Sequence, residues 1–490
     1  MLFNSYIFVL LFFPVTVILY HLINKTGHYT LSKLFLLAMS LWFYCYERPE
    51  GVIVLLISIL INYMAASFLF PSIKNEALKK FSLAAVILIN LLILFYFKYM
   101  GFFADIINHI TGGDLRVENI ILPLGISFFT FSQISYVTDS YREPDTRYSF
   151  LDYALFISFF PKISVGPIAF AKEMIPQFND TLKKVPDHGN ISRGLFIFAL
   201  GLSKKVLIAD NMAKMADWGY SNIVFLDTPL SLIIILSYTM QIYYDFSGYC
   251  DMATGVCKML NIDLPVNFDS PYRSLSINEF WKRWHITLTR FFRNYIYFPL
   301  GGSRKGTART YINILIIYFI SGIWHGADYT FIVWGLLYGV GMCISKAVSP
   351  ISVKWPKAVR FILTFSFVNL AWVFFRADSV ATAIQVIKTL FSFTFNEIPP
   401  AFVVSSVPIE FELIQWLLAT FYPGSTVVSG FIMILLLLIF AIMASIFMKN
   451  PIRRAENFKP SGKYVVMTVI LITWSVLSLS EVTPFLYTNF

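Results

Sequence analysis

The stretch that decides the fold is Ser321-Gly-Ile-Trp-His-Gly-Ala-Asp-Tyr-Thr-Phe-Ile-Val-Trp-Gly335. It lies inside an apolar run, residues 310–345, in which His325 and Asp328 are the only ionisable side chains apart from tyrosines and one cysteine. Glycines on both sides of His325 interrupt a helix and let a ligand or another backbone come close. Because an ionisable residue at membrane depth indicates a functional site, we predict a reaction centre at His325 inside a bilayer.

The composition of the 490-residue chain favours a membrane protein over a soluble one. Hydrophobic residues make up 57% of the chain and charged residues 13%, whereas soluble proteins carry roughly 25% charged residues. Apolar runs of spanning length recur at 8–23, 52–70, 83–97, 230–243, 427–447 and 465–479. Since about 20 residues cross a bilayer, we predict an all-α polytopic membrane protein with roughly ten to thirteen transmembrane or re-entrant helices.

The N-terminus and the cysteines narrow the class further. No basic segment precedes the first apolar run and no small-residue cleavage site follows it, so we expect the first helix to be retained. The four cysteines lie in or beside apolar runs and form no C-x-x-C pair. They are predicted to be small core hydrophobes rather than disulfides or metal ligands, and we expect no metal site and no bound cofactor.

The distribution of Lys and Arg predicts the topology, because short cytoplasmic loops collect basic residues. Lys25 and Lys33 mark the first loop, and five basic residues between 449 and 463 mark the last. Both termini are therefore predicted to be extracytoplasmic, as is the stretch after Asp378. The bias is mixed between 141 and 269, where the topology is left unassigned. No repeat or soluble domain is visible, so residues 1–490 are treated as a single membrane domain.

Basic residues also flank the segment around His325, with Arg304, Lys305 and Arg309 before it and Lys346 after it. Two crossings need about 40 residues plus a turn, more than the segment offers. We predict two short arms that meet near 322–326, with His325 roughly 20 Å from the cytoplasmic end. The alternative is a core histidine bonded to backbone carbonyls at a helix break. Burying an imidazole costs free energy, which argues against a role in packing alone. The imidazole is also well suited to moving a proton near neutral pH.

A second histidine, His285, lies in a basic and aromatic stretch. If residues 278–297 form one helix, His285 lies at the edge of an apolar stripe, which predicts an interfacial helix on the cytoplasmic face. Topology and lipid head-group contact explain most basic clusters. The functional alternative is that the cluster forms a basic entrance to the protein that attracts a polyanionic donor such as coenzyme A, with Arg283 and Arg304 as candidate contacts. The cluster consists of Arg273, Lys282, Arg283, Arg290, Arg293, Arg304, Lys305 and Arg309.

A polar island, residues 241–251, follows the apolar run that starts at Leu230. Its two carboxylates, Asp245 and Asp251, are either intramembrane groups or lie at the extracytoplasmic end of a helix. The pattern of residues leaves both interpretations open.

Taken together, these motifs resemble the alginate O-acetyltransferase branch of the membrane-bound O-acyltransferase family over essentially the whole chain. Their order and spacing carry the resemblance. The motifs are Met1-Leu-Phe-Asn-Ser5 with Phe13-Pro14, the island at 241–251, the block from Trp284-His285 to Pro299-Leu-Gly-Gly302, and Gly322-Ile-Trp-His-Gly326.

The resemblance implies helices curved around a central tunnel, with a core at about residues 119–376. It places the family's catalytic histidine at His325 and its second histidine at His285. It also implies transfer of an acetyl group from cytosolic acetyl-CoA to an extracytoplasmic polysaccharide, through a multi-pass protein of the bacterial cytoplasmic membrane. A separate extracytoplasmic acetyltransferase is the expected partner, and no nucleic acid is expected.

The chemistry agrees with this reading, because a hydroxyl that attacks a thioester needs a base and protection from water. We predict that His325 is the general base and that His285 orients it, contacts the donor or stabilises developing charge. Trp324 and Asp245 are candidates for lining the tunnel or binding the donor. No Gly-x-Ser-x-Gly elbow supports an acyl-serine mechanism.

The tail Phe485-Leu-Tyr-Thr-Asn-Phe490 resembles a short aromatic C-terminal motif of related acyl-export systems. The resemblance implies that Tyr487 accepts the acyl group and presents it outside. The alternative is an aromatic residue of the membrane interface.

Two other functions compete with acetyl export. The same fold could export a D-alanyl group for teichoic acid, although such members resemble this chain less at the N-terminus and lack its long region after Asp378. A non-enzymatic transporter would also contain buried histidines and a polar island, but the inverted repeats typical of transporters are not apparent.

Overall fold

The computed structural model describes residues 1–47, 49–117, 120–408, 411–421, 426–456, 458, 460–479 and 483–486. Within these ranges the regular elements are helices, and no strand occurs. The N-terminal part contains η1 (Phe8–Phe12), α1 (Phe13–Lys25), α2 (Tyr29–Glu47), α3 (Gly51–Met64), η2 (Ala65–Leu69), α4 (Phe70–Ser72), α5 (Glu76–Thr111), α6 (Ile126–Arg142), α7 (Phe150–Ser158), α8 (Phe160–Ile163) and α9 (Ala171–Asn179).

The remainder is helical as well. The middle part contains η3 (Leu182–Lys184), α10 (His188–Ser203), η4 (Lys204–Ala209), α11 (Asp210–Ser221), η5 (Ile223–Phe225), α12 (Thr228–Met259), η6 (Pro271–Arg273), α13 (Ile277–Trp281), α14 (Ile286–Phe292), η7 (Arg293–Tyr297), α15 (Thr307–His325) and α16 (Tyr329–Ser352). The last part contains α17 (Lys357–Arg376), α18 (Val380–Leu390), α19 (Pro400–Ser406), α20 (Glu412–Phe421), α21 (Thr426–Phe447), α22 (Pro451–Glu456) and α23 (Gly462–Leu477).

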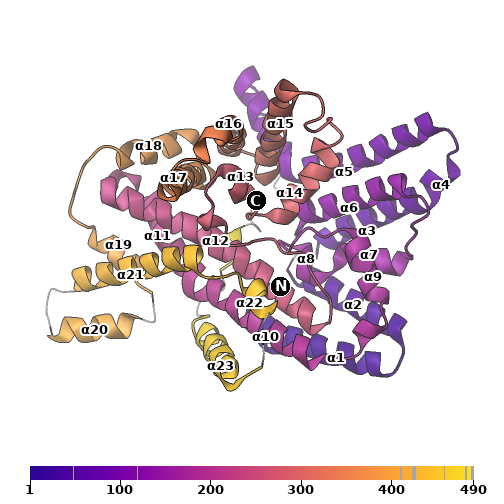
Figure 1. The fold of residues 1–490 in the computed structure, drawn as a ribbon, viewed down its shortest axis with the longest axis horizontal. Coiled ribbons are helices and arrows are strands. Elements are labelled where there is room, and N and C mark those ends of the chain that lie inside the picture. The colour runs from indigo at the N-terminus through magenta and orange to yellow at the C-terminus, as the bar shows by residue number, and fades with distance from the viewer. Residues whose placement is uncertain are drawn as a thin grey trace.

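The 32-residue helix α12 runs through the centre of the molecule and is buried along most of its length (Figure 1). Two glycine pairs bring α10 against it. A Cβ added at Gly194 would lie 2.5 Å from the carbonyl oxygen of Gly255, and one added at Gly201 would lie 2.7 Å from that of Gly248. Glycine is therefore needed for this close packing, which builds the core around the polar island.

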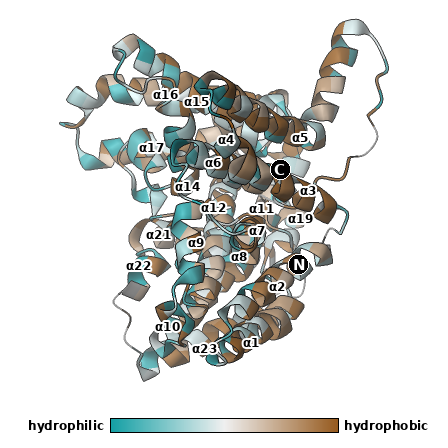
Figure 2. Ribbon diagram, turned by 90° about the vertical axis from the view of Figure 1, so that its right-hand side faces the viewer, coloured by the Kyte–Doolittle hydropathy of each residue, from teal (hydrophilic) through white to brown (hydrophobic). Residues whose placement is uncertain are grey.

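The predicted all-α polytopic architecture is confirmed. Among the described residues, six helical segments are long and apolar enough to cross a membrane. Brown hydrophobic residues dominate peripheral helices such as α1, α2 and α5 (Figure 2). The predicted runs at 8–23, 52–70, 83–97 and 427–447 correspond to four of these segments. Helix α12 is not among the six because its polar island lowers its hydropathy. The four cysteines are free, and of the predicted core positions Cys250 and Cys257 are buried, whereas Cys45 and Cys343 are only partly buried.

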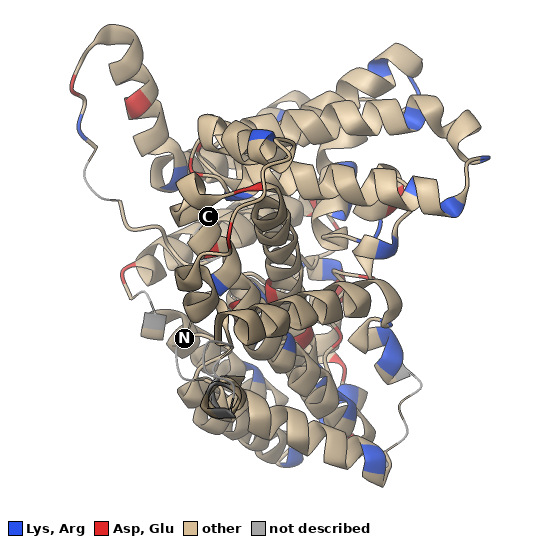
Figure 3. Ribbon diagram, turned by 90° about the vertical axis from the view of Figure 1, so that its left-hand side faces the viewer, with Lys and Arg blue, Asp and Glu red and all other residues tan. Residues whose placement is uncertain are grey.

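Most Lys and Arg residues gather toward one edge of the molecule, and the N-terminus lies toward the opposite edge (Figure 3). The N-terminal and C-terminal segments are neighbours, because Asn4 Nδ2 donates a hydrogen bond of 2.9 Å to the carbonyl of Thr483. This geometry agrees with the expectation that both ends lie on the same side. Which side faces outward stays a prediction.

Two local predictions are wrong. Residues 278–297 do not form one interfacial helix, because the chain turns between α13 and α14, where the Arg283 carbonyl bonds the Asp269 N–H and the Ile286 N–H bonds the Asn267 carbonyl. Local backbone pairing with 267–269 thus replaces helical hydrogen bonds. The arms that meet at His325 are also longer than expected, because α16 continues past Lys346 to Ser352 and is long and apolar enough to span alone.

Candidate active site

His325 is the last residue of α15, and the turn after it leads directly into α16. The two helices pack closely through glycines, since a Cβ on Gly322 would lie 2.4 Å from the Phe331 carbonyl oxygen. Asp328 caps α16 by accepting a hydrogen bond of 2.9 Å from the Thr330 N–H. The glycines beside His325 therefore admit another backbone and a neighbouring ring. The Phe331 ring would clash with any Cβ at Gly326.

Helix α5 holds the end of α15 in place. The Lys98 ammonium donates hydrogen bonds to the carbonyls of Trp324, at 2.5 Å, and His325, at 3.0 Å, and the Tyr99 hydroxyl donates one to the Ile323 carbonyl at 3.0 Å. The last carbonyls of a helix lack partners within the helix and attract cations. Lys98 and Tyr99 thus fix the backbone that carries the His325 imidazole.

His285 stands at the start of α14 in the left-handed region, with φ 43° and ψ 52°. This conformation is costly for a residue with a Cβ and tends to occur at functional sites. Asn267 Oδ1 lies 3.1 Å from His285 Nδ1 and also accepts hydrogen bonds from the backbone N–H and hydroxyl of Thr287. The Thr287 backbone N–H can only donate a hydrogen bond, so the Asn267 side-chain atom that it contacts must be the amide oxygen and not the amide nitrogen. His285 Nδ1 must then donate to it, which leaves the lone pair of the neutral ring on Nε2.

The indole of Trp324 lies near both imidazoles, with its ring centroid 6.2 Å from that of His285 and 4.8 Å from that of His325. The His325 ring also contacts Trp334 and Phe375, at 5.0 and 5.2 Å. Both histidines are buried, with 0% and 3% of their surface exposed. The structure therefore brings the two predicted histidines and Trp324 together in a site enclosed by aromatic rings, suited to proton transfer away from bulk water.

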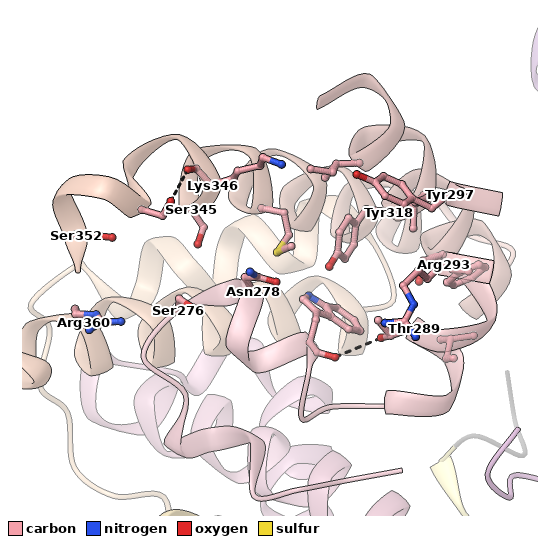
Figure 4. A pocket seen from close by; sticks show the side chains of 18 of the residues that line it. Ser276, Asn278, Thr289, Arg293, Tyr297, Tyr318, Ser345, Lys346, Ser352 and Arg360 are labelled. Carbon is pink, nitrogen blue, oxygen red and sulfur yellow. Dashed lines mark hydrogen bonds between the residues drawn. The ribbon is translucent and has the colours of Figure 1, made fainter. Parts of the chain in front are cut away.

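A cavity of about 450 Å³ opens beside this site. Trp281 and Ser321 form part of its wall, together with Tyr318 (Figure 4). Ser321 precedes His325 by four residues on α15, so the two side chains share one helix face about 5–6 Å apart. Trp281 also contacts Trp334, which in turn contacts His325. The inner end of the cavity thus lies about one helical turn from the His325 imidazole.

Three cations surround this cavity, namely Arg293, Lys346 and Arg360 (Figure 4). For these three, no ion pair with an acidic residue occurs in the described part of the chain. The candidates from sequence lie elsewhere. Arg283 pairs with Glu279 at 3.0 Å and Asp269 at 3.4 Å, and Arg304 is exposed in a turn that does not line the cavity. Spacing along the chain did not distinguish these arginines, because their partners come from the fold.

The polar island lies in the middle of α12, inside the helix bundle and away from either end of the helix, whereas its depth in the membrane stays a prediction. Asp251 forms an ion pair with Lys204 at 2.6 Å. Asp245 and Asp210 both pair with Lys205, each at 2.8 Å. The side chains of Asp245 and Lys205 are only 3% and 2% exposed. Asp245 therefore belongs to a buried ion cluster and does not line the cavity beside His325.

The C-terminal segment is bound to that cluster. The Leu486 N–H donates to Asp245 Oδ2 at 2.9 Å, the Thr483 hydroxyl donates to Asp210 at 2.7 Å, and Lys205 donates to the Pro484 carbonyl at 3.3 Å. The Phe485 ring is 1% exposed. The candidate relay Tyr487 lies outside the described residues. Its neighbour Leu486 is attached to α12 at Asp245, next to Phe246, whose ring centroid lies 4.8 Å from that of His285.

Sequence reasoning missed three residues of this site: Lys98, Lys205 and Asn267. A lysine inside an apolar run, as Lys98 is, was a usable signal, because such charges are rare in spanning segments. Asn267 gave no such signal, since its partners His285 and Thr287 lie 18 and 20 residues away in the chain.

Comparisons with known proteins agree with this arrangement. The sequence model of the MBOAT, membrane-bound O-acyltransferase family matches residues 109–382. A peptidoglycan O-acetyltransferase of Helicobacter pylori is 41% identical over 79% of this chain and 79% of its own length. A probable alginate O-acetylase AlgI of Pseudomonas aeruginosa is 34% identical over 80% of this chain and 75% of its own. A teichoic acid D-alanyltransferase of Streptococcus thermophilus is 24% identical over 53% of this chain and 69% of its own.

Proposed function

The chain belongs to the membrane-bound O-acyltransferase family, and on that premise we propose that it moves an acetyl group from cytosolic acetyl-CoA across the membrane. The final acceptor is a hydroxyl of an extracytoplasmic polysaccharide. The single observation that carries the proposal is the cavity with three cations at its rim, whose inner end lies about one helical turn from His325.

The cavity fits the shape and charge of the donor. Coenzyme A joins an anionic phosphate-bearing end to a long, largely uncharged arm that ends in the thioester. Arg293, Lys346 and Arg360 supply the charge-assisted contacts that phosphates prefer. The inner wall around Trp281 and Tyr318 offers an apolar and aromatic surface for the arm. This arrangement would present the thioester carbonyl to the aromatic site.

In the proposed reaction a ring nitrogen of His325 takes the proton of the acceptor hydroxyl. The hydroxyl oxygen attacks the thioester carbonyl carbon, the C–S bond breaks, and the sulfur leaves and takes up the proton. His285 orients the acceptor during this step. Its geometry supports that role, because Asn267 fixes its tautomer and ring position.

Tyr487 is proposed as the first acceptor. Its phenol would form an aryl acetate, which a separate extracytoplasmic acetyltransferase then consumes. The position of the preceding residues supports this proposal. The Leu486 N–H donates a hydrogen bond to Asp245 on α12, and the ring of the next residue on that helix, Phe246, packs on the His285 ring. The described chain before Tyr487 therefore ends close to the helix position that packs on His285.

A D-alanyl cargo is the second candidate. The D-alanyltransferase relative aligns with about half of this chain at 24% identity, whereas the relatives named for O-acetylation align with about four fifths at 34–41%. Acetyl is therefore the favoured cargo. Among the acceptors, peptidoglycan and alginate are the two named by those relatives.

The test is the release of coenzyme A from labelled acetyl-CoA by purified protein in nanodiscs. Wild type should turn over, His325→Ala should not, and Tyr487→Phe should fail to retain label on the C-terminal peptide. Labelled peptide in Tyr487→Phe would exclude the relay but leave the donor assignment intact. Turnover with D-alanyl thioester and none with acetyl-CoA would exclude the acetyl proposal.

A further inference from the structure

A second cavity of about 580 Å³ lies away from the histidines, between η4, α21 and α23. Each helix contributes a row of apolar side chains at helical spacing. The row on α21 runs from Met433 through Leu437 and Phe440 to Ala444, and the facing row on α23 is Met467, Leu471 and Trp474. Because α21 and α23 lie at the periphery of the bundle and expose apolar side chains (Figure 1), the cavity is a groove with apolar walls that we expect to face the bilayer.

The polar groups of the groove walls mostly have partners within the protein. Lys204 pairs with Asp251 at 2.6 Å, the Tyr244 hydroxyl donates to the Ala441 carbonyl at 2.7 Å, and the Asn450 amide donates to the Phe268 carbonyl. Because these polar groups already have partners in the protein, the body of the groove does not require a polar ligand.

One end of the groove differs, because Lys449 and Arg454 line it without an acidic partner in the described part of the chain. The short helix α22 holds them there. Its neighbouring residue Arg453 pairs with Asp269 at 2.7 Å, and Asn450 caps it by accepting from the Ile452 N–H at 2.7 Å. The groove therefore combines a long apolar body with two positive charges at one end that have no acidic partner among the described residues.

From this charge distribution we propose that the groove binds an anionic phospholipid, with its phosphate at Lys449 and Arg454 and an acyl chain along α21. The row from Met433 to Ala444 spans roughly 16 Å of helix, close to the roughly 15 Å of one leaflet's hydrocarbon. Juxtamembrane cations select anionic lipids over zwitterionic ones. The site is separate from the proposed acetyl route, because His285 and His325 do not line it.

The test uses the full chain in nanodiscs that contain equal amounts of phosphatidylglycerol and phosphatidylcholine, released into mild detergent for native mass spectrometry. Wild type should retain phosphatidylglycerol in preference to phosphatidylcholine. The Lys449→Ala/Arg454→Ala variant should lose this retention roughly tenfold. The matched control is Lys74→Ala/Lys463→Ala, which removes two exposed charges that do not line the cavity and should retain the lipid.

A second pair of variants protects the test against misfolding. Ala444→Trp fills the groove and should exclude lipid, whereas Ile439→Trp places the same bulk on the exposed face of α21 and should not. Equal retention of both lipids by wild type would overturn the proposal, and so would undiminished phosphatidylglycerol on the charge variant. A lipid-free dimer would assign the groove to a second copy instead.

Discussion

The imidazoles of His285 and His325 lie among aromatic rings, whereas Asp245 and Asp251 on the neighbouring helix α12 each face a lysine ammonium group. Both regions are buried, and both are polar islands in an apolar bundle. The ion pairs of α12 are expensive to break, because one charge would then stay buried alone. The aromatic surroundings of the histidines instead favour the neutral ring, which can take up and return a proton.

This difference separates two tasks. The lysine–carboxylate cluster holds a structure together, including the chain segment at 483–486, which three of its members bind. The histidine region is where the reacting groups would meet. The predictions that follow test whether the two tasks are as separate as their surroundings suggest.

The largest effect is expected at His325. Replacing it with Ala should lower coenzyme A release from acetyl-CoA by roughly 10²- to 10⁴-fold, because a positioned acid–base group contributes about that much. The protein should keep its elution profile and melting temperature. His21→Ala is the matched control, since His21 is also buried but bonds the Met259 carbonyl, and it should retain activity. Wild-type turnover in the His325→Ala variant would contradict the assignment of His325 as the general base.

The next comparison sets Asp245→Asn against Asp251→Asn. Each breaks a buried ion pair and should lower the free energy of unfolding by about 3–5 kcal/mol. Only Asp245→Asn should also release the tail and lower acetyl transfer by roughly 100-fold, the cost of misplacing a reacting group.

Tail release is measured by thiol labelling of a Thr483→Cys variant, combined with each substitution. Faster labelling with Asp245→Asn alone is the expected result. Equal labelling and equal activity in both variants would mean that the two ion pairs serve stability only.

A smaller effect is expected at Lys98. Lys98→Met removes the ammonium bonded to the Trp324 and His325 carbonyls, and kcat should fall roughly tenfold, in line with the loss of charge-assisted hydrogen bonds. The KM for acetyl-CoA should stay unchanged. Lys162→Met is the control, because Lys162 is also buried but contacts Ser132 and Phe156 instead. A rise in KM without a change in kcat would contradict a positioning role.

The smallest effects are expected at the cavity rim. Arg293→Ala, Lys346→Ala and Arg360→Ala should each raise the KM for acetyl-CoA about five- to tenfold, with kcat little changed. The increase should shrink at high salt, since exposed charges are screened. Arg283→Ala and Arg304→Ala serve as controls with the same charge loss. If these two controls raised KM more than the rim variants did, the donor would enter elsewhere.

Several features were predictable from local sequence because they depend on composition and period. The apolar runs that became α1, α3, α5 and α21 needed only length and hydropathy. The prediction that His325 is functional needed only the observation that ionisable residues are rare in apolar segments of spanning length. The predicted helix at 278–297 failed because hydrogen bonds with residues 267–269 outweigh local helical periodicity.

The sequence by itself determined an all-helical membrane protein and singled out His325 and His285, since hydropathy and residue type are local properties. Only the tertiary structure decided which cations surround the cavity, which side chain orients His285, and that the tail binds Asp245 and Lys205. These contacts join residues up to 279 positions apart. Their energies depend on burial and distance in space, which no short stretch of sequence specifies.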